Sequence, residues 1–195
     1  MKPEQDILFD IKEFFKDKFT VKVNKKGYKY AYYDIKWLLE IGLTEDSQEE
    51  SKTANTVKSL QKFLVNKYKN RIKAEAKVAE GMTLRFNSDN FDIENIEIDT
   101  TKLMAFDLLD IENGCAFEIS LADAFAEFFK DVLKALLDSR VKKLYLCMRN
   151  HNYHGSGKSG FIKVASSNMI KQYIQLARLY KLEIILIDIF PRCNE

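Results

Sequence analysis

A chain of 195 residues with 46% hydrophobic and 31% charged residues can bury a core, and its seven glycines and two prolines exclude a loop-rich chain. No apolar run is long enough to span a bilayer, and the N-terminus lacks the basic start and apolar run of a secretory signal. Three cysteines without CxxC spacing favour the reducing cytoplasm, so we expect a cytoplasmic protein with no membrane partner.

The net charge of +2 hides a segregation of charge along the chain. Residues 51–80 carry eight Lys or Arg against two Glu, and residues 140–192 carry ten against two acids. The intervening residues 81–125 carry ten acids. Such runs are usually solvated faces, but an acidic segment between basic ones also suits a metal site in a phosphate-attracting groove.

Apolar spacing in the first hundred residues predicts short elements and one basic helix. Residues 44–53 are polar and acidic without periodicity, which predicts an exposed loop. The expected helices cover residues 6–19, 34–43 and 57–69, and the expected strands cover 27–33, 82–87 and 95–99.

The second half has clearer patterns. Its expected helices cover residues 122–138 and 167–180, and its expected strands after the hairpin cover 142–148 and 182–189. The first of these helices is expected to pack through one apolar stripe, made of Phe125, Phe129, Leu133, Leu136 and Leu137. Strands that alternate with helices at these spacings predict an α/β fold, with parallel crossovers on a mixed central β-sheet that helices flank on both faces.

The residues from 102 to 120 predict a β-hairpin, because two apolar runs flank a turn at 111–114. Its Asn-Gly pair supplies the positive φ that tight hairpin turns need. Antiparallel pairing about this turn places Asp107 across from Glu118. Two facing carboxylates among apolar residues are costly to bury unless a cation lies between them, so the hairpin predicts a cation site.

The oxygen atoms of the hairpin suit a hard cation. Strand alternation turns Glu118 and Ser120 to one side and Ile119 to the other. The Asp107 and Glu118 carboxylates and the Ile119 backbone carbonyl are donors that Mg²⁺ accepts. Asp110 is an alternative to Asp107, although an aspartate so near a turn is usually structural. The other interpretation is a pair of exposed carboxylates on the solvent side of a hairpin.

A family resemblance adds to this pattern. The hairpin FDLLDIENGCAFEIS resembles the active-site hairpin of the PD-(D/E)XK nucleases, most closely that of the BglII/BstYI group of type II restriction endonucleases. The helix and strand over 122–148 follow at the spacing of that group. The run GSGKSGFIKVASSNMIKQYIQLARLYKLEIILIDIFP resembles its C-terminal loop, helix and strand. The resemblance covers about residues 100–191, and its motif is short.

The resemblance implies a restriction-endonuclease-like core over residues 101–195, with residues 1–100 as an N-terminal extension of one domain spanning 1–195. It implies a homodimer that cleaves double-stranded DNA with Mg²⁺ and leaves a 5′-phosphate. Asp107, Glu118 and the Ile119 carbonyl would hold the metal.

One departure from the family concerns the water-activating residue. Most of the superfamily has Lys two residues after Glu, the BglII-like group has Gln, and this chain has Ser120. A hydroxyl can position water but brings no positive charge. Either the metal alone activates the water, or a lysine comes from elsewhere, or the site is inactive. Lys130 is the candidate lysine, with Glu127 as a further helper.

The polar segment 149–160 predicts a loop that contacts DNA. Its candidate donors are Arg149, Asn150, His151, Asn152, His154 and Lys158. The two histidines could instead bind a transition metal, although no further ligands complete a zinc site, and an ordinary surface loop is the other alternative. The GSGKS sequence at 155–159 lacks the first glycine of a P-loop, so we expect no nucleotide cofactor.

The sequence thus predicts a Mg²⁺-dependent DNA endonuclease, a type II restriction enzyme in the first interpretation. The catalytic residues would be Asp107, Glu118, Ser120 and Lys130. One alternative is an inactive nuclease-like module that binds nucleic acid or protein, which Ser120 favours. Another is a repair or mobile-element nuclease with the same fold.

Overall fold

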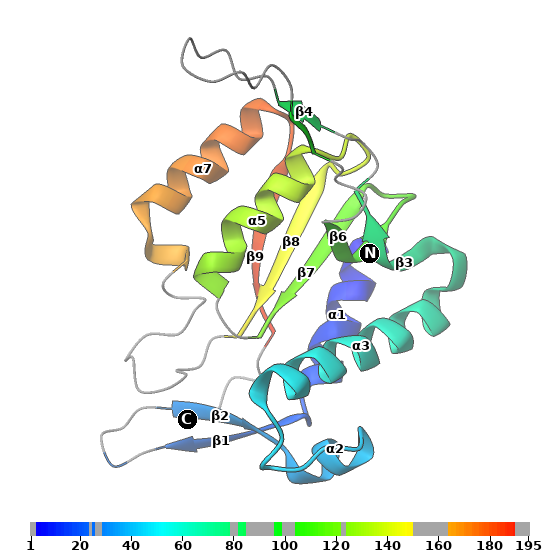
Figure 1. Ribbon diagram of the computed structural model, residues 1–195, viewed down its shortest axis with the longest axis vertical. Coiled ribbons are helices and arrows are strands. Elements are labelled where there is room, and N and C mark those ends of the chain that lie inside the picture. The colour runs from blue at the N-terminus through cyan, green and yellow to red at the C-terminus, as the bar shows by residue number, and fades with distance from the viewer. Residues whose placement is uncertain are drawn as a thin grey trace.

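The fold is α/β, and a mixed five-stranded sheet with helices on both faces forms its centre (Figure 1). The expected fold class is confirmed at this level. The computed structural model describes residues 3–23, 25, 29–78, 82–84, 96–98, 104–121, 124–149 and 164–189. The strands of the sheet, in spatial order, are β3 (Ile72–Lys77), β6 (Ala105–Asp110), β7 (Cys115–Ser120), β8 (Lys143–Met148) and β9 (Glu183–Asp188).

Parallel and antiparallel pairing divide this sheet in two. β3, β6 and β7 pair antiparallel, whereas β7, β8 and β9 pair parallel. The parallel strands are connected by α5 (Ala124–Leu136) and α7 (Asn168–Leu179). The apolar strand runs near residues 142–148 and 182–189 are therefore parallel sheet strands, as predicted, because both of their faces are covered.

The β6–β7 hairpin forms as predicted. Leu108 pairs with Phe117, Leu109 with Ala116, and Asp110 with Cys115. Gly114 supplies a positive φ of 61°, and its carbonyl accepts the N–H groups of residues 142 and 143. A Cβ at this glycine would lie 2.8 Å from the carbonyl oxygen of residue 140, so glycine is required by both conformation and space.

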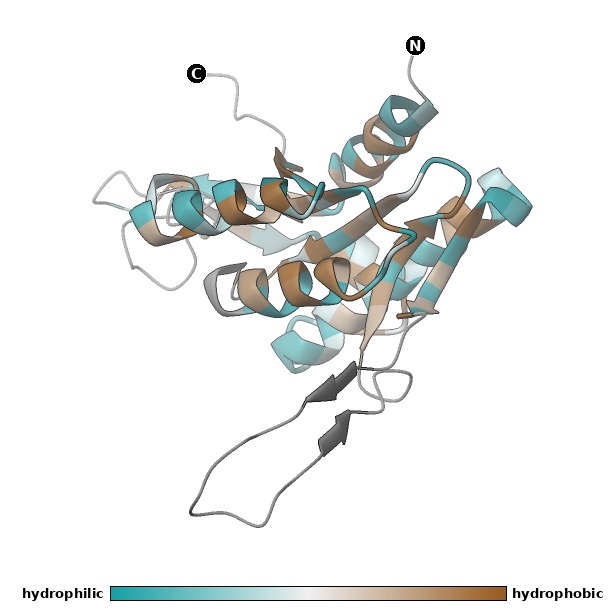
Figure 2. Ribbon diagram, turned by 90° about the horizontal axis from the view of Figure 1, so that it is seen from above, coloured by the Kyte–Doolittle hydropathy of each residue, from teal (hydrophilic) through white to brown (hydrophobic). Residues whose placement is uncertain are grey.

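Each face of the sheet has its own hydrophobic core. The helices α1 (Pro3–Phe15) and α3 (Glu49–Tyr68) contribute to one core with Phe117, Ile119 and Tyr145. The helices α5 and α7 contribute to the other core with Ala116, Leu144 and neighbouring residues. Figure 2 shows mostly hydrophobic central strands, while the helices carry both hydrophobic and hydrophilic residues.

The N-terminal elements extend the first core. The hairpin strands are β1 (Phe19–Val23) and β2 (Lys29–Tyr33), followed by the short helix α2 (Ile35–Glu40). Phe19, Tyr33 and Trp37 from these elements belong to the same hydrophobic cluster as Phe117 of the sheet. A 3₁₀ turn, η1 (Lys69–Arg71), joins α3 to β3. A separate antiparallel pair consists of β4 (Met82–Leu84) and β5 (Ile96–Ile98).

Several predicted boundaries were wrong. The helix expected to start at 57 starts at Glu49, inside the segment predicted as a loop, because Glu49 and Glu50 favour the positive end of a helix. The strands β1 and β3 were not predicted. The stripe expected for α5 was wrong in part. Phe129 and Leu137 pack against the second core as expected, but Leu133 and Leu136 are exposed, and Phe128, Val132 and Ala135 are buried in their place.

None of the helices in the described ranges is long and apolar enough to cross a membrane.

Candidate active site

A pocket of about 400 Å³ lies where α5 passes over the start of β6 and the end of β7. Asp107, Glu118, Ile119, Ser120 and Lys130 all line it, so the predicted metal-binding and catalytic residues lie together. Glu127 of α5 and Thr53 of α3 contribute to its wall. The sequence prediction did not include Asp131 and Lys134 of α5, which also line the pocket.

Strand alternation places Glu118 in this pocket. Phe117 and Ile119 point into the core beneath α1, so Glu118 and Ser120 point to the opposite face, toward α5. Both side chains are buried, Glu118 at 4% exposure and Ser120 at 9%. A buried carboxylate at the end of an apolar strand requires specific partners.

The alternation of β6 is interrupted at Asp107. Phe106 packs in the core beneath α5, whereas Leu108 packs in the core on the opposite face, although residues two apart in a regular strand share a face. The neighbouring strand is irregular at the same level. Glu75 of β3 would face Asp107 in the register, but its backbone is left-handed, with φ of 47°, and it is missing from the pairing.

This interruption leaves Asp107 with two special contacts. The Gln61 side chain of α3 donates to the Asp107 carbonyl oxygen at 3.0 Å. The Ile119 N–H donates to Asp107 Oδ2 at 2.8 Å. Asp107 is therefore held through its backbone by α3 and through its carboxylate by β7, and its carboxylate lies within hydrogen-bonding reach of Glu118.

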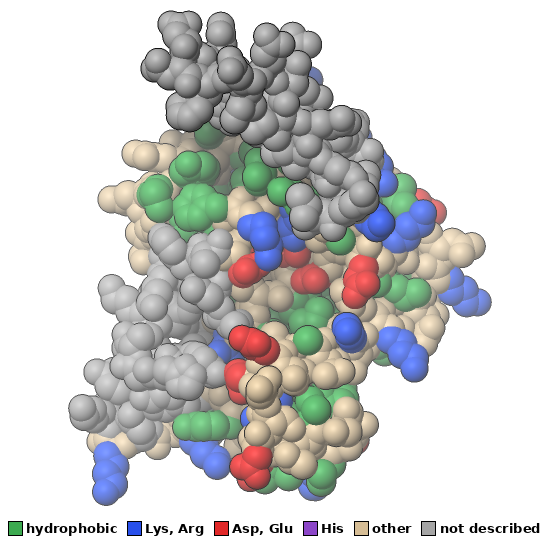
Figure 3. Space-filling model, in the orientation of Figure 1, with side chains coloured by type: hydrophobic (Ala, Val, Ile, Leu, Met, Phe, Trp, Pro, Cys, Tyr) green, Lys and Arg blue, Asp and Glu red, His purple; other side chains and the backbone are tan. Residues whose placement is uncertain are grey.

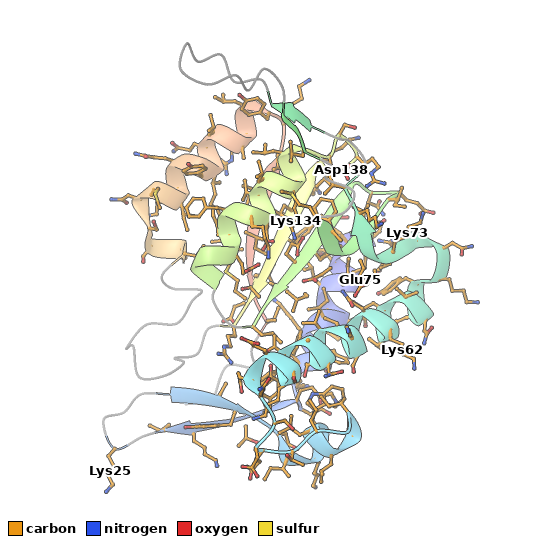
Figure 4. The ribbon with its side chains drawn as sticks, in the orientation of Figure 1. Lys25, Lys62, Lys73, Glu75, Lys134 and Asp138 are labelled. Atoms are coloured by element: carbon orange, nitrogen blue, oxygen red, sulfur yellow. The ribbon has the colours of Figure 1, made fainter. Side chains whose placement is uncertain are left out.

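Lys134 of α5 lies between the carboxylates of Glu118 and Asp131. Its side chain is 5% exposed, and its ammonium lies 2.5 Å from Glu118 Oε1 and 2.9 Å from Asp131 Oδ1. It donates a hydrogen bond to the Ala105 carbonyl at 3.1 Å. Figure 4 marks Lys134 on α5, above the strands. A cation was expected between Asp107 and Glu118; the structure pairs the Lys134 ammonium with Glu118 and Asp131, and the expected metal stays a prediction.

Three buried oxygens in the pocket retain unused hydrogen-bonding capacity. Glu118 Oε1 and Asp131 Oδ1 lie at ion-pair distance from Lys134 but have no aligned hydrogen bond among the described residues. Ser120 Oγ is buried and has no hydrogen-bond partner in the same set. Buried polar atoms normally find partners. These oxygens therefore point to a ligand or water in the pocket.

The carboxylates are electrostatically disfavoured where they lie. Burial, followed by the charges of Asp131 and Asp107, raises the pKa of Glu118 well above its ordinary value. Burial also raises the pKa of Asp107, against the Ile119 amide and Lys134. Burial raises the pKa of Asp131 to about 6, although Lys134 acts in the opposite direction. Among the described residues of the pocket, these three acids share one buried ammonium, that of Lys134, so the pocket favours additional positive charge.

The excess of acidic groups in the pocket also shifts the pKa of the Lys134 ammonium. Burial alone would lower its pKa, but the attraction of Glu118 and Asp131 outweighs this and raises it. Lys134 is therefore a charged lysine in a buried site.

Lys130 occupies a different environment from the one predicted. It lines the pocket, but its ammonium pairs with Glu127, and both side chains are about half exposed. The lysine that contacts Glu118 is Lys134, one helical turn later. The sequence signal for Lys134 was its i, i+3 spacing from Asp131, which places the pair on one side of α5.

Asp110 is held away from the pocket. It is fully buried, and Arg71 donates to its Oδ2 through Nε at 3.0 Å and through a terminal nitrogen at 2.6 Å. The Asn113 side chain also donates to both of its oxygens. The structure therefore gives Asp110 the role of a turn residue with its own counter-ion.

The predicted DNA loop is described only at its first residue. Arg149 follows β8 and is 4% exposed, so its side chain is not at the surface. Asn150, His151, Asn152, His154 and Lys158 lie outside the described residues. The contact of this loop with DNA therefore stays a prediction.

In the described residues, no three His, Cys, Asp or Glu side chains are arranged as a group that could hold a metal. The oxygens of Glu118, Asp131 and Ser120 are nevertheless the hard donors that Mg²⁺ accepts. The chemistry of the donors fits a divalent cation, and the position between two of them is held by Lys134.

No protein-family model matches the chain, and no curated protein or solved structure matches it at a significant level.

Proposed function

We propose that this protein is a metal-dependent DNA endonuclease with a restriction-endonuclease-like core. The observation that carries the proposal is the pocket in which Asp107 and Glu118, from adjacent strands, face each other beside a buried lysine. A mixed sheet whose hairpin carries the two acids, followed by a helix and a parallel strand, is the order expected of that core. The resemblance to the BglII/BstYI group adds the substrate, double-stranded DNA.

Asp107, Glu118 and the Ile119 carbonyl would hold Mg²⁺ in this proposal. The ion would supply Lewis acidity toward the scissile phosphate and the attacking water. The protein residues supply the geometry: Gln61 and the Ile119 N–H fix Asp107, and β7 fixes Glu118.

Ser120 and Lys134 would act on the attacking water and the phosphate. The Ser120 hydroxyl has free hydrogen-bonding capacity in the pocket and can accept from and orient a water molecule. The Lys134 ammonium supplies the positive charge that Ser120 lacks, in place of the predicted Lys130. The side chain that orients the water and the side chain that carries the charge therefore come from different elements.

The surroundings of the pocket suit a polyanion. Figure 3 shows acidic side chains near the middle of one face, with Lys and Arg side chains around them. Exposed lysines are present on α3 at Lys58 and Lys62, and on β3 at Lys73 and Lys77. Figure 4 marks Lys62 and Lys73 on these elements. Basic residues around an acidic site attract a phosphate backbone while the acids remain available to a cation.

A second candidate function is an inactive module that binds nucleic acid. Two observations favour it: Ser120 stands where the family has Lys or Gln, and Lys134 already neutralises part of the acid charge. A homodimer, as in restriction enzymes, is part of the first proposal only.

The test is incubation of phage-sized duplex DNA with purified protein and Mg²⁺, for the wild type, Glu118→Gln and Glu183→Gln. Glu183 is the matched control, because it is exposed at the first residue of β9, at the opposite end of the parallel strands. Discrete fragments from the wild type and Glu183→Gln, absent with Glu118→Gln or EDTA, support the nuclease. If the protein binds the duplex but does not cleave it, the inactive module is supported. If Glu118→Gln still cleaves DNA, the proposed site is wrong.

A further inference from the structure

The buried charges of the pocket do not balance. Among the described residues, Asp107, Glu118 and Asp131 contribute three carboxylates to the buried part of the pocket, and Lys134 contributes one ammonium. Lys130 and Glu127 form their own pair nearer the solvent. The buried set has an excess of two negative charges when all its acids are ionised, which equals the charge of one divalent cation.

The position of Lys134 coincides with the best oxygen donors. Its ammonium contacts Glu118 Oε1 and Asp131 Oδ1, the same buried atoms that lack an aligned hydrogen bond. A divalent cation that uses these oxygens must take the place of the ammonium, because both cannot occupy one position.

We propose that Lys134 is the internal counter-ion of this pocket in the free protein, and that a divalent cation binding to Glu118 and Asp131 displaces its ammonium. This inference takes only the class of ligand, a divalent cation, from the proposed function. It adds Asp131 as a metal ligand and assigns Lys134 two positions, one on the carboxylates and one toward the pocket opening.

The side chain of Lys134 is suited to this movement. It has a flexible four-carbon stem and a compact charge. Among the described residues, its one aligned hydrogen bond goes to the neutral carbonyl of Ala105, the first residue of β6. Ala105 is exposed and lines the pocket, so we place the second position of the ammonium on this side. The displaced charge then lies beside the cation, where a phosphate oxygen can receive it.

Lysine acetylation of the wild-type protein tests the displacement directly. The protein is treated with an amine-reactive acetyl ester with and without saturating Mg²⁺, and acetylation at each lysine is followed by mass spectrometry. We expect acetylation of Lys134 to rise by roughly tenfold with Mg²⁺, equivalent to 1.4 kcal/mol in the exposed population. Acetylation of Lys171, which is exposed on α7 and does not line the pocket, should change little and serves as the internal control.

A pair of variants tests the competition. Titration calorimetry compares Mg²⁺ binding by the wild type, Lys134→Met and Lys171→Met at the same pH. Removal of the competing ammonium should tighten binding by roughly tenfold in Lys134→Met, which is 1.4 kcal/mol. Lys171 is exposed on α7 and does not line the pocket, so Lys171→Met should bind as the wild type does. If Lys134→Met does not fold, the acetylation of the wild type decides the question.

The outcomes separate this inference from the nuclease proposal. Mg²⁺ binding with unchanged acetylation of Lys134 overturns the displacement, whether or not DNA is cleaved. Increased acetylation of Lys134 without DNA cleavage supports the displacement and overturns the nuclease. If calorimetry detects no Mg²⁺ binding to the wild type or to Lys134→Met, the proposed metal site itself is wrong.

Discussion

Replacement of Asp131 by Asn should stabilise the protein at neutral pH. Asp131 is 3% exposed, and burial raises the pKa of its carboxyl from 3.8 to about 6 despite the contact with Lys134. Relative to the unfolded chain, the folded protein therefore favours the protonated form of Asp131 over the ionised form. One pKa unit corresponds to about 1.36 kcal/mol, so the ionised carboxylate destabilises the folded state by about 3 kcal/mol at pH 7.5. Asn removes the charge and keeps the shape.

The sign follows from proton linkage. Between about pH 4 and pH 6, folded Asp131 retains a proton that the unfolded chain has released, so the contribution of Asp131 to stability falls as the pH rises through this range. Above this pH range, the loss of stability caused by ionised Asp131 is complete and no longer changes with pH. The gain from Asp131→Asn should therefore be about 3 kcal/mol at pH 7.5 and less than about 1 kcal/mol at pH 4.

Urea unfolding at both pH values measures this difference. The matched control is Glu127→Gln, one turn earlier on α5, where the carboxyl is about half exposed and paired with Lys130. An exposed pair contributes at most about 1 kcal/mol, so the control should change little at either pH. An Asp131→Asn variant that is equally or less stable than the wild type at pH 7.5 would refute the charge imbalance inferred for the pocket.

Three further predictions concern the elements that hold the site. Gln61→Leu leaves the Asp107 carbonyl without its hydrogen-bond donor, so it should lower the free energy of unfolding by about 1–3 kcal/mol, which urea unfolding measures. If the pocket cleaves DNA, the same variant should also reduce cleavage. Gly114→Ala should destabilise by more than about 1 kcal/mol, because its φ is positive and a Cβ would meet the Arg140 carbonyl at 2.8 Å; thermal unfolding checks this. Burial raises the pKa of Cys115 to about 11, so at pH 8 its thiol should react with Ellman's reagent only after unfolding.

The central sheet could be predicted because its signals are local. The Asn-Gly turn fixed the hairpin register, and the apolar runs of β8 and β9 indicated covered parallel strands. β3 could not be predicted in this way. Its sequence IKAEAK is rich in helix-forming residues, and as the edge strand it pairs only with β6 and leaves three of its side chains exposed.

The site was predicted only on the strands. The register of the hairpin brought Asp107 and Glu118 together without any knowledge of tertiary contacts. The helix above them was harder, because α5 has apolar residues on more than one side. The predicted stripe included Leu133 and Leu136, which are exposed. The buried side instead carries Asp131 and Lys134, and no helical periodicity of apolar residues reveals a lysine that is buried by ion pairing.

Three departures from regular structure lie in or beside the pocket, which favours a site there. Glu75 has a left-handed backbone, the alternation of β6 changes at Asp107, and Lys134 is buried with more acids than it can neutralise. Each feature destabilises the fold, by about 1–3 kcal/mol for the backbone strain alone. A chain selected only for stability would lose them independently. Their coincidence around a single pocket is expected where selection preserves binding or chemistry at the expense of stability. These features favour a site whatever its ligand, and the Glu118→Gln comparison tests the proposal that the pocket cleaves DNA.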